Sequence, residues 1–378
     1  MKKCVVVSDS FKGTVSSREI CEIAQRVIPR HFPACEVVCI PVADGGEGTV
    51  DCFIQAMGAQ RVGVTVTNAL GEKSAAAYAR IGELAIIEMA AAAGLPQVGA
   101  LRCPGTATTY GVGELIAHAV DSGCRKILLG LGGSATNDGG CGCAVALGVR
   151  FYDAAGQSFV PVGDTLGRIA RIDTAKADEL LRSVEITVMC DVTNPLYGPT
   201  GAAYVFAPQK GADAEKVKSL DAGLRHFGDV IRSQYGLDVS AMPGAGAAGG
   251  MGAGCVALLG GMIQSGIDAV LDVTGFDRQL EGADLVITGE GRIDSQSADG
   301  KVVSGVARRT RAKGVPLIAI AGGIADSAGA VYDIGVSAMF STDRAALPVD
   351  MLGARSPGDY EETLSDIMSL IAIAERFA

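Results

Sequence analysis

Four apolar segments of this chain each run into an acidic residue that is followed by a turn-forming sequence. The four acidic residues are Asp9, Asp44, Asp191 and Glu290. Ligands of open α/β sheets bind outside the carboxyl ends of the strands, where carboxylates and accessible backbone amides suit a metal ion and phosphate groups. A single aspartate after a strand is usually a turn residue, but four such residues favour a binding site.

Further charged residues lie in the same turns and extend this candidate chemistry. Second carboxylates follow at Glu47 and Asp294, and such pairs are candidates to hold Mg²⁺. Lys12 and Lys301 are candidates to neutralise phosphate charge, and the planar guanidinium of Arg292 matches a substrate carboxylate. Phosphoryl transfer needs a metal, positive charge and an orienting base, so the set favours that reaction. Each cation could equally be a solvated surface residue.

Two glycine-rich segments, 130–140 and 244–254, could offer backbone amides to a nucleotide or a substrate. In the first, the hydroxyls of Ser134 and Thr136 could line an anion pocket or cap the next helix. Residues 130–135 also match G-x-G-x-x-A after a predicted strand, with Asp153 about 20 residues later. This match keeps an NAD(P)-dependent oxidoreductase acting on a small hydroxy acid as the alternative function.

Apolar runs, caps and turns predict an alternating β-α order at both ends of the chain. Ser16 and Glu19 form a capping-box pattern, and Asp213 and Asp359 are predicted to open two later helices. Strands are predicted over 4–7, 36–42, 61–67, 75–81, 83–90, 125–129, 184–190, 285–288 and 317–321. The strands between 61 and 90 form a meander that interrupts the alternation and indicates entry into another domain.

We therefore predict two α/β domains with mainly parallel sheets, one inserted into the other. The first, Rossmann-like domain is predicted over 1–65 and 284–378, and the inserted domain, which carries the glycine-rich loops, over 66–283. This arrangement is common because the two termini of a chain often share one domain.

Composition and charge exclude several classes of function. The 378-residue chain has a net charge of −10 and no basic stripe, which disfavours nucleic-acid binding. It has 11 cysteines without a CxxC pair and only three histidines, which disfavours a zinc finger, a histidine-ligated metal and a Ser-His-Asp hydrolase. No signal-peptide pattern is present, and glycines and a proline break the uncharged stretch 239–267. We expect no membrane span and a cytoplasmic location.

Six motifs together resemble those of the bacterial type 1 glycerate kinases. They are DSFKG (9–13), VADGGEGT (42–49), GLGGSATNDGG (130–140), CDVTNPLYGPTGAA (190–203), GAGAAGGMGAG (244–254) and TGEGRIDSQSADGK (288–301). The resemblance implies two α/β domains with the active site in the cleft between them, and transfer of the ATP γ-phosphate to D-glycerate with Mg²⁺. It also implies 2-phosphoglycerate as the product, and a cytosolic role in the breakdown of glyoxylate, glycolate or sugar acids.

The motif positions and the glycine loops together give the expected site residues. The catalytic residues are expected to be Asp191, Lys12 and Asp44, with Asp191 orienting or deprotonating the glycerate hydroxyl. The metal ligands are expected to be Glu290, Asp294 and Glu47. The substrate-binding and nucleotide-binding residues are expected to be Asp9, Asn194, Arg292, Lys301, Ser134, Gly132, Gly133, Gly249 and Gly250.

Some questions stay open at the level of sequence. The residues do not decide which carboxylate is the base and which bind the metal, or which glycerate hydroxyl is phosphorylated. A homo-oligomer is compatible with the chain. A non-catalytic ligand sensor is a third class of function, but the number of carboxylates at strand ends argues against it, because a sensor does not need that many desolvated charges.

Overall fold

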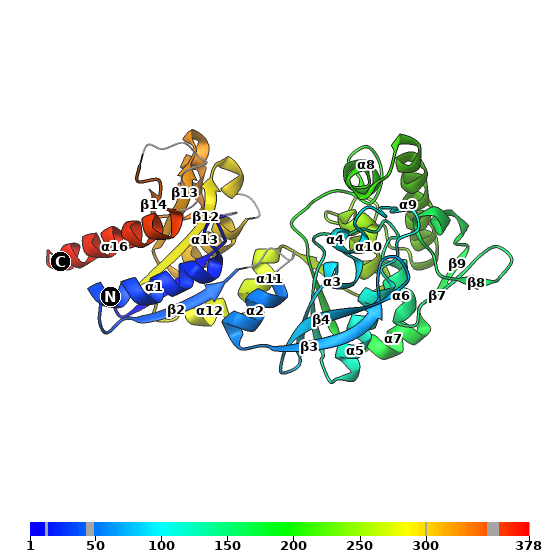
Figure 1. The fold of residues 1–378 in the computed structure, drawn as a ribbon, viewed down its shortest axis with the longest axis horizontal. Helices are drawn as coiled ribbons and strands as arrows, with labels where there is room; N and C mark the ends of the chain where they lie inside the picture. Colours follow the sequence, from blue (N-terminus) through cyan, green and yellow to red (C-terminus); the bar gives the residue numbers. More distant parts are fainter. Residues whose placement is uncertain (12–13, 43–48, 299–300, 346–354, 378) are drawn as a thin grey trace. The chain divides into compact units, whose positions relative to one another are not determined.

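The computed structural model describes residues 1–11, 14–42, 49–298, 301–345 and 355–377. The chain divides into two compact units. The first unit consists of Met1–Ala43 and Ile267–Ala378, and the second consists of Asp44–Gly266. Figure 1 shows that the blue N-terminal and the red C-terminal segments both belong to the first unit. The second unit therefore interrupts the first in the sequence.

The two divisions lie earlier in the chain than the boundaries that we predicted at 65 and 284. Residues 60–65 belong to strand β3 (Gln60–Thr67), which is part of the sheet of the second unit. Helices α11 (Gly266–Val273) and α12 (Phe276–Gln279) contribute Ile267, Leu271 and Phe276 to a hydrophobic core of the first unit. The sequence pattern missed these divisions because tertiary packing sets them.

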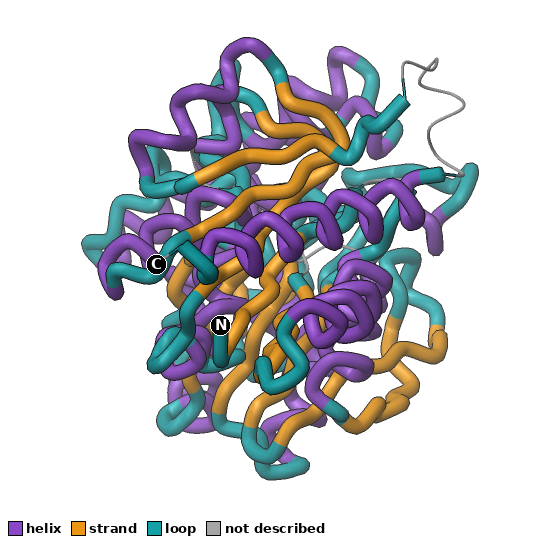
Figure 2. Tube along the Cα trace, turned by 90° about the vertical axis from the view of Figure 1, so that its left-hand side faces the viewer, coloured by secondary structure: helices purple, strands orange, loops and turns teal. Residues whose placement is uncertain are grey.

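The first unit contains a five-stranded parallel sheet with the order β14-β13-β12-β1-β2. Its strands are β1 (Lys3–Ser8), β2 (Glu36–Pro41), β12 (Leu285–Ile293), β13 (Leu317–Ile324) and β14 (Ala338–Ser341). Its other helical segments are α1 (Ser17–His31), η3 (Ser295–Ala298), α13 (Val302–Lys313), η4 (Asp326–Gly329), α14 (Ala330–Ile334) and α16 (Ser356–Ala374). Figure 2 shows strands between layers of helices.

Helices cover both faces of this sheet because its strands are apolar on both faces. Cys4 and Val6 pack in a core that includes residues of α1 and α16, whereas Val5 and Val7 pack in another core with residues of α11 and α13. Successive side chains of a strand point to opposite faces, which explains this alternation. Strands that are buried on both sides read as continuous apolar runs, as β1 does.

Helix starts in this unit follow local sequence signals in one case and depart from them in another. The predicted capping box forms, since Ser16 Oγ accepts from Glu19 N at 3.2 Å and Glu19 Oε2 accepts from Ser16 N at 2.9 Å. The prediction that Asp359 opens the last helix is wrong. Helix α16 begins at Ser356, because a proline is favoured in the first turn, and Asp359 instead pairs with Arg355 at 3.1 Å.

The second unit contains a six-stranded mixed sheet with the order β11-β10-β6-β5-β4-β3. The remaining strands of this sheet are β4 (Lys73–Ile81), β5 (Leu84–Glu88), β6 (Lys126–Gly130), β10 (Glu185–Met189) and β11 (Met262–Gln264). The predicted meander corresponds to β3, β4 and β5, which pair antiparallel. The other pairs are parallel. The predicted fold class, α/β with mainly parallel sheets, is confirmed.

Helices and a small antiparallel sheet complete the second unit. The small sheet consists of β7 (Arg150–Tyr152), β8 (Ser158–Phe159) and β9 (Arg171–Asp173). The helical segments are α2 (Thr49–Met57), α3 (Ala90–Ala93), α4 (Leu95–Val98), α5 (Tyr110–Asp121), α6 (Cys141–Ala146), η1 (Gly163–Arg168), α7 (Ala175–Leu181), α8 (Ala202–Phe206), η2 (Pro208–Lys210), α9 (Ala214–Tyr235) and α10 (Ala247–Leu259). As predicted, Asp213 caps α9, where its carboxylate accepts from Lys216 N at 2.8 Å.

The helices of the structure also bear on the membrane question. Across the described ranges, none of the helices combines the length and the apolar character that crossing a membrane requires.

Candidate functional site

Candidate site residues of the first unit gather where β1 and β12 run side by side. The parallel register pairs Ser8 with Gly289, so Asp9 and Glu290 follow paired residues on adjacent strands. The Asp9 backbone N–H donates to the Gly289 carbonyl at 2.9 Å and fixes the first residue of the turn. Asp9 also accepts from the Ser10 N–H at 2.7 Å through Oδ1. Sheet pairing therefore brings two of the predicted acidic residues together.

Glu290 lies within a strand, whereas the sequence pattern predicted it just after one. The predicted strand ended at residue 288, but β12 continues to Ile293 because β13 pairs with it as far as Ile324. The Glu290 side chain is buried and accepts a hydrogen bond from Ser297 Oγ. A carboxylate in the middle of a sheet is thus held by a hydroxyl from the segment that follows the strand.

Burial raises the pKa of the Glu290 carboxyl above its ordinary value, and the negative charges of Asp9 and Asp294 raise it further. The hydrogen bond from Ser297 and the charge of Lys301 act in the opposite direction. Asp294 follows β12 directly, and its Oδ1 accepts from Gln296 N at 2.9 Å. Asp9, Glu290 and Asp294 form what we call the acidic edge.

The donor set of the acidic edge matches the chemistry of Mg²⁺. Within the described parts of the chain, no three His, Cys, Asp or Glu side chains are arranged as a complete metal cage. Mg²⁺ does not require one, because it usually binds one or two carboxylates together with waters and substrate phosphates. A divalent cation would stabilise the charged form of Glu290, whose pKa burial and the neighbouring carboxylates raise. Glu290 and Asp294 are oxygen donors of the kind that Mg²⁺ binds.

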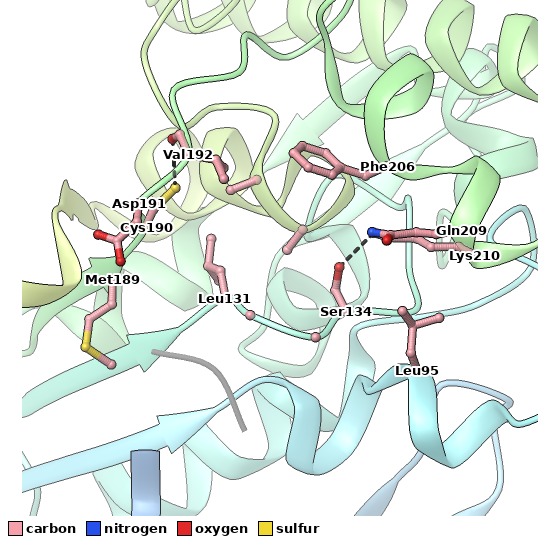
Figure 3. Close-up of a pocket in the computed structure, with 14 residues that line it drawn as sticks. Leu95, Leu131, Ser134, Met189, Cys190, Asp191, Val192, Phe206, Gln209 and Lys210 are labelled. Carbon is pink, nitrogen blue, oxygen red and sulfur yellow. Dashed lines mark hydrogen bonds between the residues drawn. The ribbon is translucent and has the colours of Figure 1, made fainter. Parts of the chain in front are cut away.

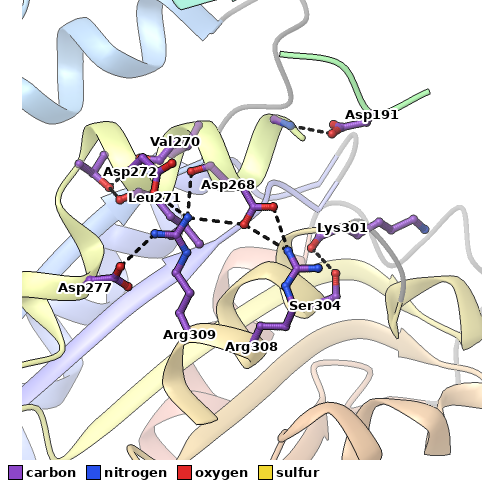
Figure 4. Close-up of polar contacts among 12 residues, drawn as sticks. Asp191, Asp268, Val270, Leu271, Asp272, Asp277, Lys301, Ser304, Arg308 and Arg309 are labelled. Atoms are coloured by element: carbon purple, nitrogen blue, oxygen red, sulfur yellow. Dashed lines mark hydrogen bonds and ion pairs between the residues drawn. The ribbon is translucent and has the colours of Figure 1, made fainter. Parts of the chain in front are cut away.

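The two predicted cations of this unit differ in their local positions. Arg292 is an exposed residue of β12. Lys301 immediately precedes α13, and Figure 4 shows its side chain extending away from the helix, while its carbonyl accepts from Ser304 Oγ at 2.8 Å. Figure 4 also shows ion pairs that tie α13 to α11, in which Arg308 contacts Asp268 at 2.9 Å.

Three further predicted residues, Lys12, Asp44 and Glu47, lie outside the described residues.

The second unit contains a pocket of about 260 Å³, which Figure 3 shows in close-up. Four predicted site residues line it, namely Gly132, Gly133, Ser134 and Asp191. The rest of the lining is mostly apolar and includes Leu131, Met189 and Phe206. A concave, mostly apolar pocket with a few convergent polar groups is the usual form of a small-molecule site.

Sheet register explains why these distant residues share a pocket. Strands β6 and β10 are parallel neighbours, and Gly130 pairs with Met189 at their carboxyl ends. The glycine-rich segment 131–140 and the segment that begins at Cys190 therefore leave the same edge of the sheet. Ligands of open α/β sheets bind at such an edge, where strands end side by side.

Asp191 combines an exposed side chain with a fixed orientation. Its Oδ1 accepts a hydrogen bond from the Gly266 N–H at 2.7 Å, and Figure 4 shows this contact. Asn194 holds its own segment instead of lining the pocket, since its Nδ2 donates to the Thr200 carbonyl at 2.8 Å. Its carbonyl also accepts from Gly246 N at 3.0 Å and so links this segment to the second glycine-rich loop.

Gly249 and Gly250 are not among the residues that line the pocket. Both have positive φ angles, and a Cβ atom on Gly249 would collide with the Thr136 carbonyl oxygen. The Gly249 carbonyl accepts from Gly139 N at 3.0 Å. These glycines allow the two glycine-rich loops to pack closely, and Ala247 and Ala248 of the same loop line the pocket in their place.

Sequence reasoning missed Lys210, a buried charge that lines the pocket. Its side chain is only 2% exposed, and its Nζ donates to Ser134 Oγ and to the Thr136 carbonyl, each at 2.7 Å. Burial lowers the pKa of Lys210 to about 7, although the charge of Asp138 acts in the opposite direction. No motif marked this lysine, because only the folded chain buries it under the glycine-rich loop.

Asp138 is a second buried charge that the sequence did not single out. Its carboxylate is fully buried and accepts from Thr109 N and Oγ1, both at 2.8 Å, and from Gly140 N and Gly142 N. Burial raises the pKa of this carboxyl even though the hydrogen bonds from Thr109 lower it. Asp138 therefore holds the conformation of the loop from inside the protein. A buried carboxylate needs protein hydrogen-bond partners in place of water, which explains its four hydrogen bonds.

The dinucleotide pattern does not have the structural context that such a site needs. Asp153 lies in the turn between β7 and β8, where its Oδ1 accepts from Ala155 N and Gln157 N at 3.0 Å each. Helix α6 begins only at Cys141, so the glycines at 130–133 do not open a helix. A pyrophosphate site of this kind requires the glycine turn to lead directly into a helix N-terminus.

Comparisons with known proteins place the chain in one family. Residues 4–372 match the Glycerate kinase family. Glycerate kinase of Bacillus cereus is 45% identical over 375 residues, which cover 98% of each chain. Glycerate 2-kinase of Escherichia coli K12 is 45% identical over 343 residues, which cover 90% of each chain. A Salmonella typhimurium LT2 crystal structure, assigned as a glycerate kinase 2, matches with a TM-score of 0.87 and 39% identity over 99% of both chains. The chain belongs to the glycerate kinase family.

Proposed function

We propose that this chain transfers the γ-phosphoryl group of ATP to D-glycerate and forms ADP and 2-phosphoglycerate. Family membership supports glycerate phosphorylation, and the 45% identity to a glycerate 2-kinase favours the 2-hydroxyl as the acceptor. Phosphoryl transfer from ATP to a hydroxy acid needs groups that bind a metal ion, a positive charge on the phosphates and a base. The described candidate residues include side chains of all three kinds. The product would enter the breakdown of glyoxylate, glycolate or sugar acids.

The observation that carries this proposal is the pocket that Asp191 shares with Gly132, Gly133 and Ser134. Asp191 is an exposed carboxylate whose orientation is fixed by the Gly266 N–H, which suits a group that accepts a hydroxyl proton. The glycines leave backbone amides accessible, and Ser134 adds a hydroxyl. In this proposal Asp191 orients and deprotonates the hydroxyl of glycerate, while the glycine loop binds the substrate or the nucleotide.

The acidic edge of the first unit supplies the metal-binding groups of the proposal. Glu290 and Asp294 would hold Mg²⁺, which neutralises phosphate charge during transfer. Asp9 would bind substrate or nucleotide, and Lys301 and Arg292 would contact anionic oxygens. Lys12, Asp44 and Glu47 keep the roles that the motifs gave them as predictions, and so does the location of the active site between the two domains.

A coupled assay tests the reaction and identifies its product. Purified protein with D-glycerate, ATP and Mg²⁺ should release ADP, and enolase alone should convert the product to phosphoenolpyruvate. If conversion requires added phosphoglycerate mutase, the product is 3-phosphoglycerate and the choice of hydroxyl is wrong. If no ADP forms with D-glycerate or any related three- or four-carbon hydroxy acid, the kinase proposal is wrong. Oxidation of NADH by hydroxypyruvate would instead support the oxidoreductase.

A further inference from the structure

The pocket of the second unit contains a basic side chain that is almost completely buried. Lys210 lines the pocket although its side chain is only 2% exposed. Burying a charged lysine removes its favourable hydration, and ion pairs or hydrogen bonds must compensate for that loss. Buried lysines are therefore rare unless they have such partners. The hydrogen bonds to Ser134 and Thr136 compensate only part of this loss, because both acceptors are uncharged.

The hydrogen-bonding capacity of Lys210 is not exhausted. An ammonium group has three N–H donors. Among the described residues, two acceptors contact Nζ, the Ser134 hydroxyl and the Thr136 carbonyl. Figure 3 shows the bond from Lys210 to Ser134 at the wall of the pocket. In its protonated form, Lys210 therefore keeps one N–H donor and a positive charge for a group that enters the pocket.

We propose that Lys210 binds an oxyanion of a substrate in this pocket and couples that binding to the uptake of a proton. The size of the pocket, 260 Å³, favours a small acid or one end of a larger ligand. The oxyanion is the carboxylate of the hydroxy acid or a phosphate of the nucleotide, and the experiment distinguishes them. This inference rests on the proposed kinase function for its choice of ligands.

The other ionisable groups around the pocket do not already neutralise Lys210. In the described lining, Asp191 and Cys190 are the remaining ionisable residues. Asp191 accepts from Gly266 N, and burial raises the pKa of the Cys190 thiol, which keeps it neutral. Asp138, on the loop beneath, favours the charged lysine, but burial outweighs it and the pKa of Lys210 is lowered to about 7. An incoming anion would add to the effect of Asp138 and raise this pKa.

The first experiment uses the wild-type protein and needs no variant. Calorimetric titration with D-glycerate, and separately with ADP, in two buffers of different ionisation enthalpy measures the protons taken up on binding. We expect uptake of up to one proton by one of the two ligands between about pH 7 and pH 8, because Lys210 is then partly neutral before binding. If neither ligand causes proton uptake, the coupling is refuted, whether or not the protein turns over.

The second experiment measures KM for each substrate from about pH 6 to pH 9, a range in which this lysine loses its proton. In the wild type, KM for the responsible substrate should rise about tenfold per pH unit above pH 7. In Lys210→Met, that KM should be about 10–100-fold higher below pH 7, the worth of a hydrogen bond to a charged group, and should no longer depend on pH. A change in KM for glycerate identifies the carboxylate, and a change for ATP identifies the phosphate.

Two further variants separate binding from folding. Lys210→Arg keeps a permanent charge, so it should restore part of the affinity and flatten the pH dependence. Lys218→Met removes an exposed lysine that pairs with Glu215 and should leave both KM values unchanged. If Lys210→Met is folded and active but changes neither KM nor its pH dependence, Lys210 only braces the loop. A wild type that does not phosphorylate glycerate refutes the proposed function instead.

Discussion

The acidic edge of the first unit and the pocket of the second unit use charge in opposite ways. At the acidic edge, the charges of Asp9 and Asp294 act on the buried Glu290, and the nearby cation Lys301 is exposed. In the pocket the cation Lys210 is buried, and the carboxylate Asp191 is exposed. The first arrangement suits a mobile divalent cation with its phosphates, and the second suits a small anion with a reactive hydroxyl. In the proposed reaction, each unit would contribute a different part of the chemistry that a kinase needs.

The comparison is tested most strongly by Asp191→Asn. The amide keeps the size of the side chain and can still accept from Gly266 N, but it cannot take a proton. We expect kcat to fall by about 10²-fold or more with little change in either KM, because a positioned base contributes that much. Steady-state kinetics measure the effect. Asp153→Asn, in the β7–β8 turn, is the control and should be silent, and equal losses in both variants would remove the assigned role of Asp191.

A smaller effect is expected where the two glycine-rich loops pack together. In Gly249→Ala the new methyl group would collide with the Thr136 carbonyl oxygen, and φ is +68°. Gly156→Ala has a similar φ of +78° but open space around the added Cβ. The difference in the free energy of unfolding between the variants isolates the collision, which we expect to cost at least about 2 kcal/mol. Denaturant unfolding that gives equal losses would show that the loops are not packed as described.

Substitution at the acidic edge should change the requirement for Mg²⁺ and leave glycerate binding in the pocket nearly unchanged. In Glu290→Gln one candidate ligand loses its charge, so we expect the Mg²⁺ concentration for half-maximal rate to rise at least about tenfold. KM for glycerate should change much less. Asp326→Asn, which alters a short helical segment of the same unit, serves as the control. A larger change in the KM for glycerate than in the metal requirement would show that Glu290 acts on glycerate binding and not on the metal.

The smallest expected effect is a shift in pH dependence caused by Ser297→Ala. The pKa of Glu290 is raised, mainly by burial, so its charged form is lost as the pH falls, beginning at a higher pH than for an ordinary carboxyl. The hydrogen bond from Ser297 opposes this rise. Its removal should move the acid limb of Mg²⁺-dependent activity upward by about one pH unit. Ser295→Ala is the matched control, and a downward shift would contradict the assigned hydrogen bond.

Local sequence signals predicted much of the secondary structure. Ser16 and Glu19, and likewise Asp213, mark helix starts through side-chain contacts within three residues, which a sequence displays directly. The continuous apolar run of β1 reports burial on both faces. The motif positions Gly132, Gly133, Ser134 and Asp191 were predicted for one site, and they line one pocket because β6 and β10 are parallel neighbours.

Non-local packing decided what the sequence did not reveal. Glu290 lies inside a strand because β13, which is later in the chain, extends the pairing of β12. Lys210 is buried because the loop that carries Ser134 and Thr136 folds onto it, and the sequence around Lys210 contains no sign of that loop. Gly249 and Gly250 resembled ligand-binding glycines, yet their positive φ angles serve a loop-to-loop contact. Such roles depend on partners that lie far away in the sequence.

The pairing of β1 with β12 has a consequence for how the protein is made. Cys4 lies opposite Leu285 in the central strand pair of the first sheet, although the whole second unit is encoded between them. During translation, the ribosome releases residues 44–266 before β12, one of the two strands that pair with β1, has been synthesised. The nascent β1 can pair with β2 and pack against α1, but its other edge and the face that α11 and α13 cover must wait, which favours slow assembly and chaperone binding. A circular permutant that starts near residue 267 would place these strands in adjacent stretches of the message and should shorten that wait.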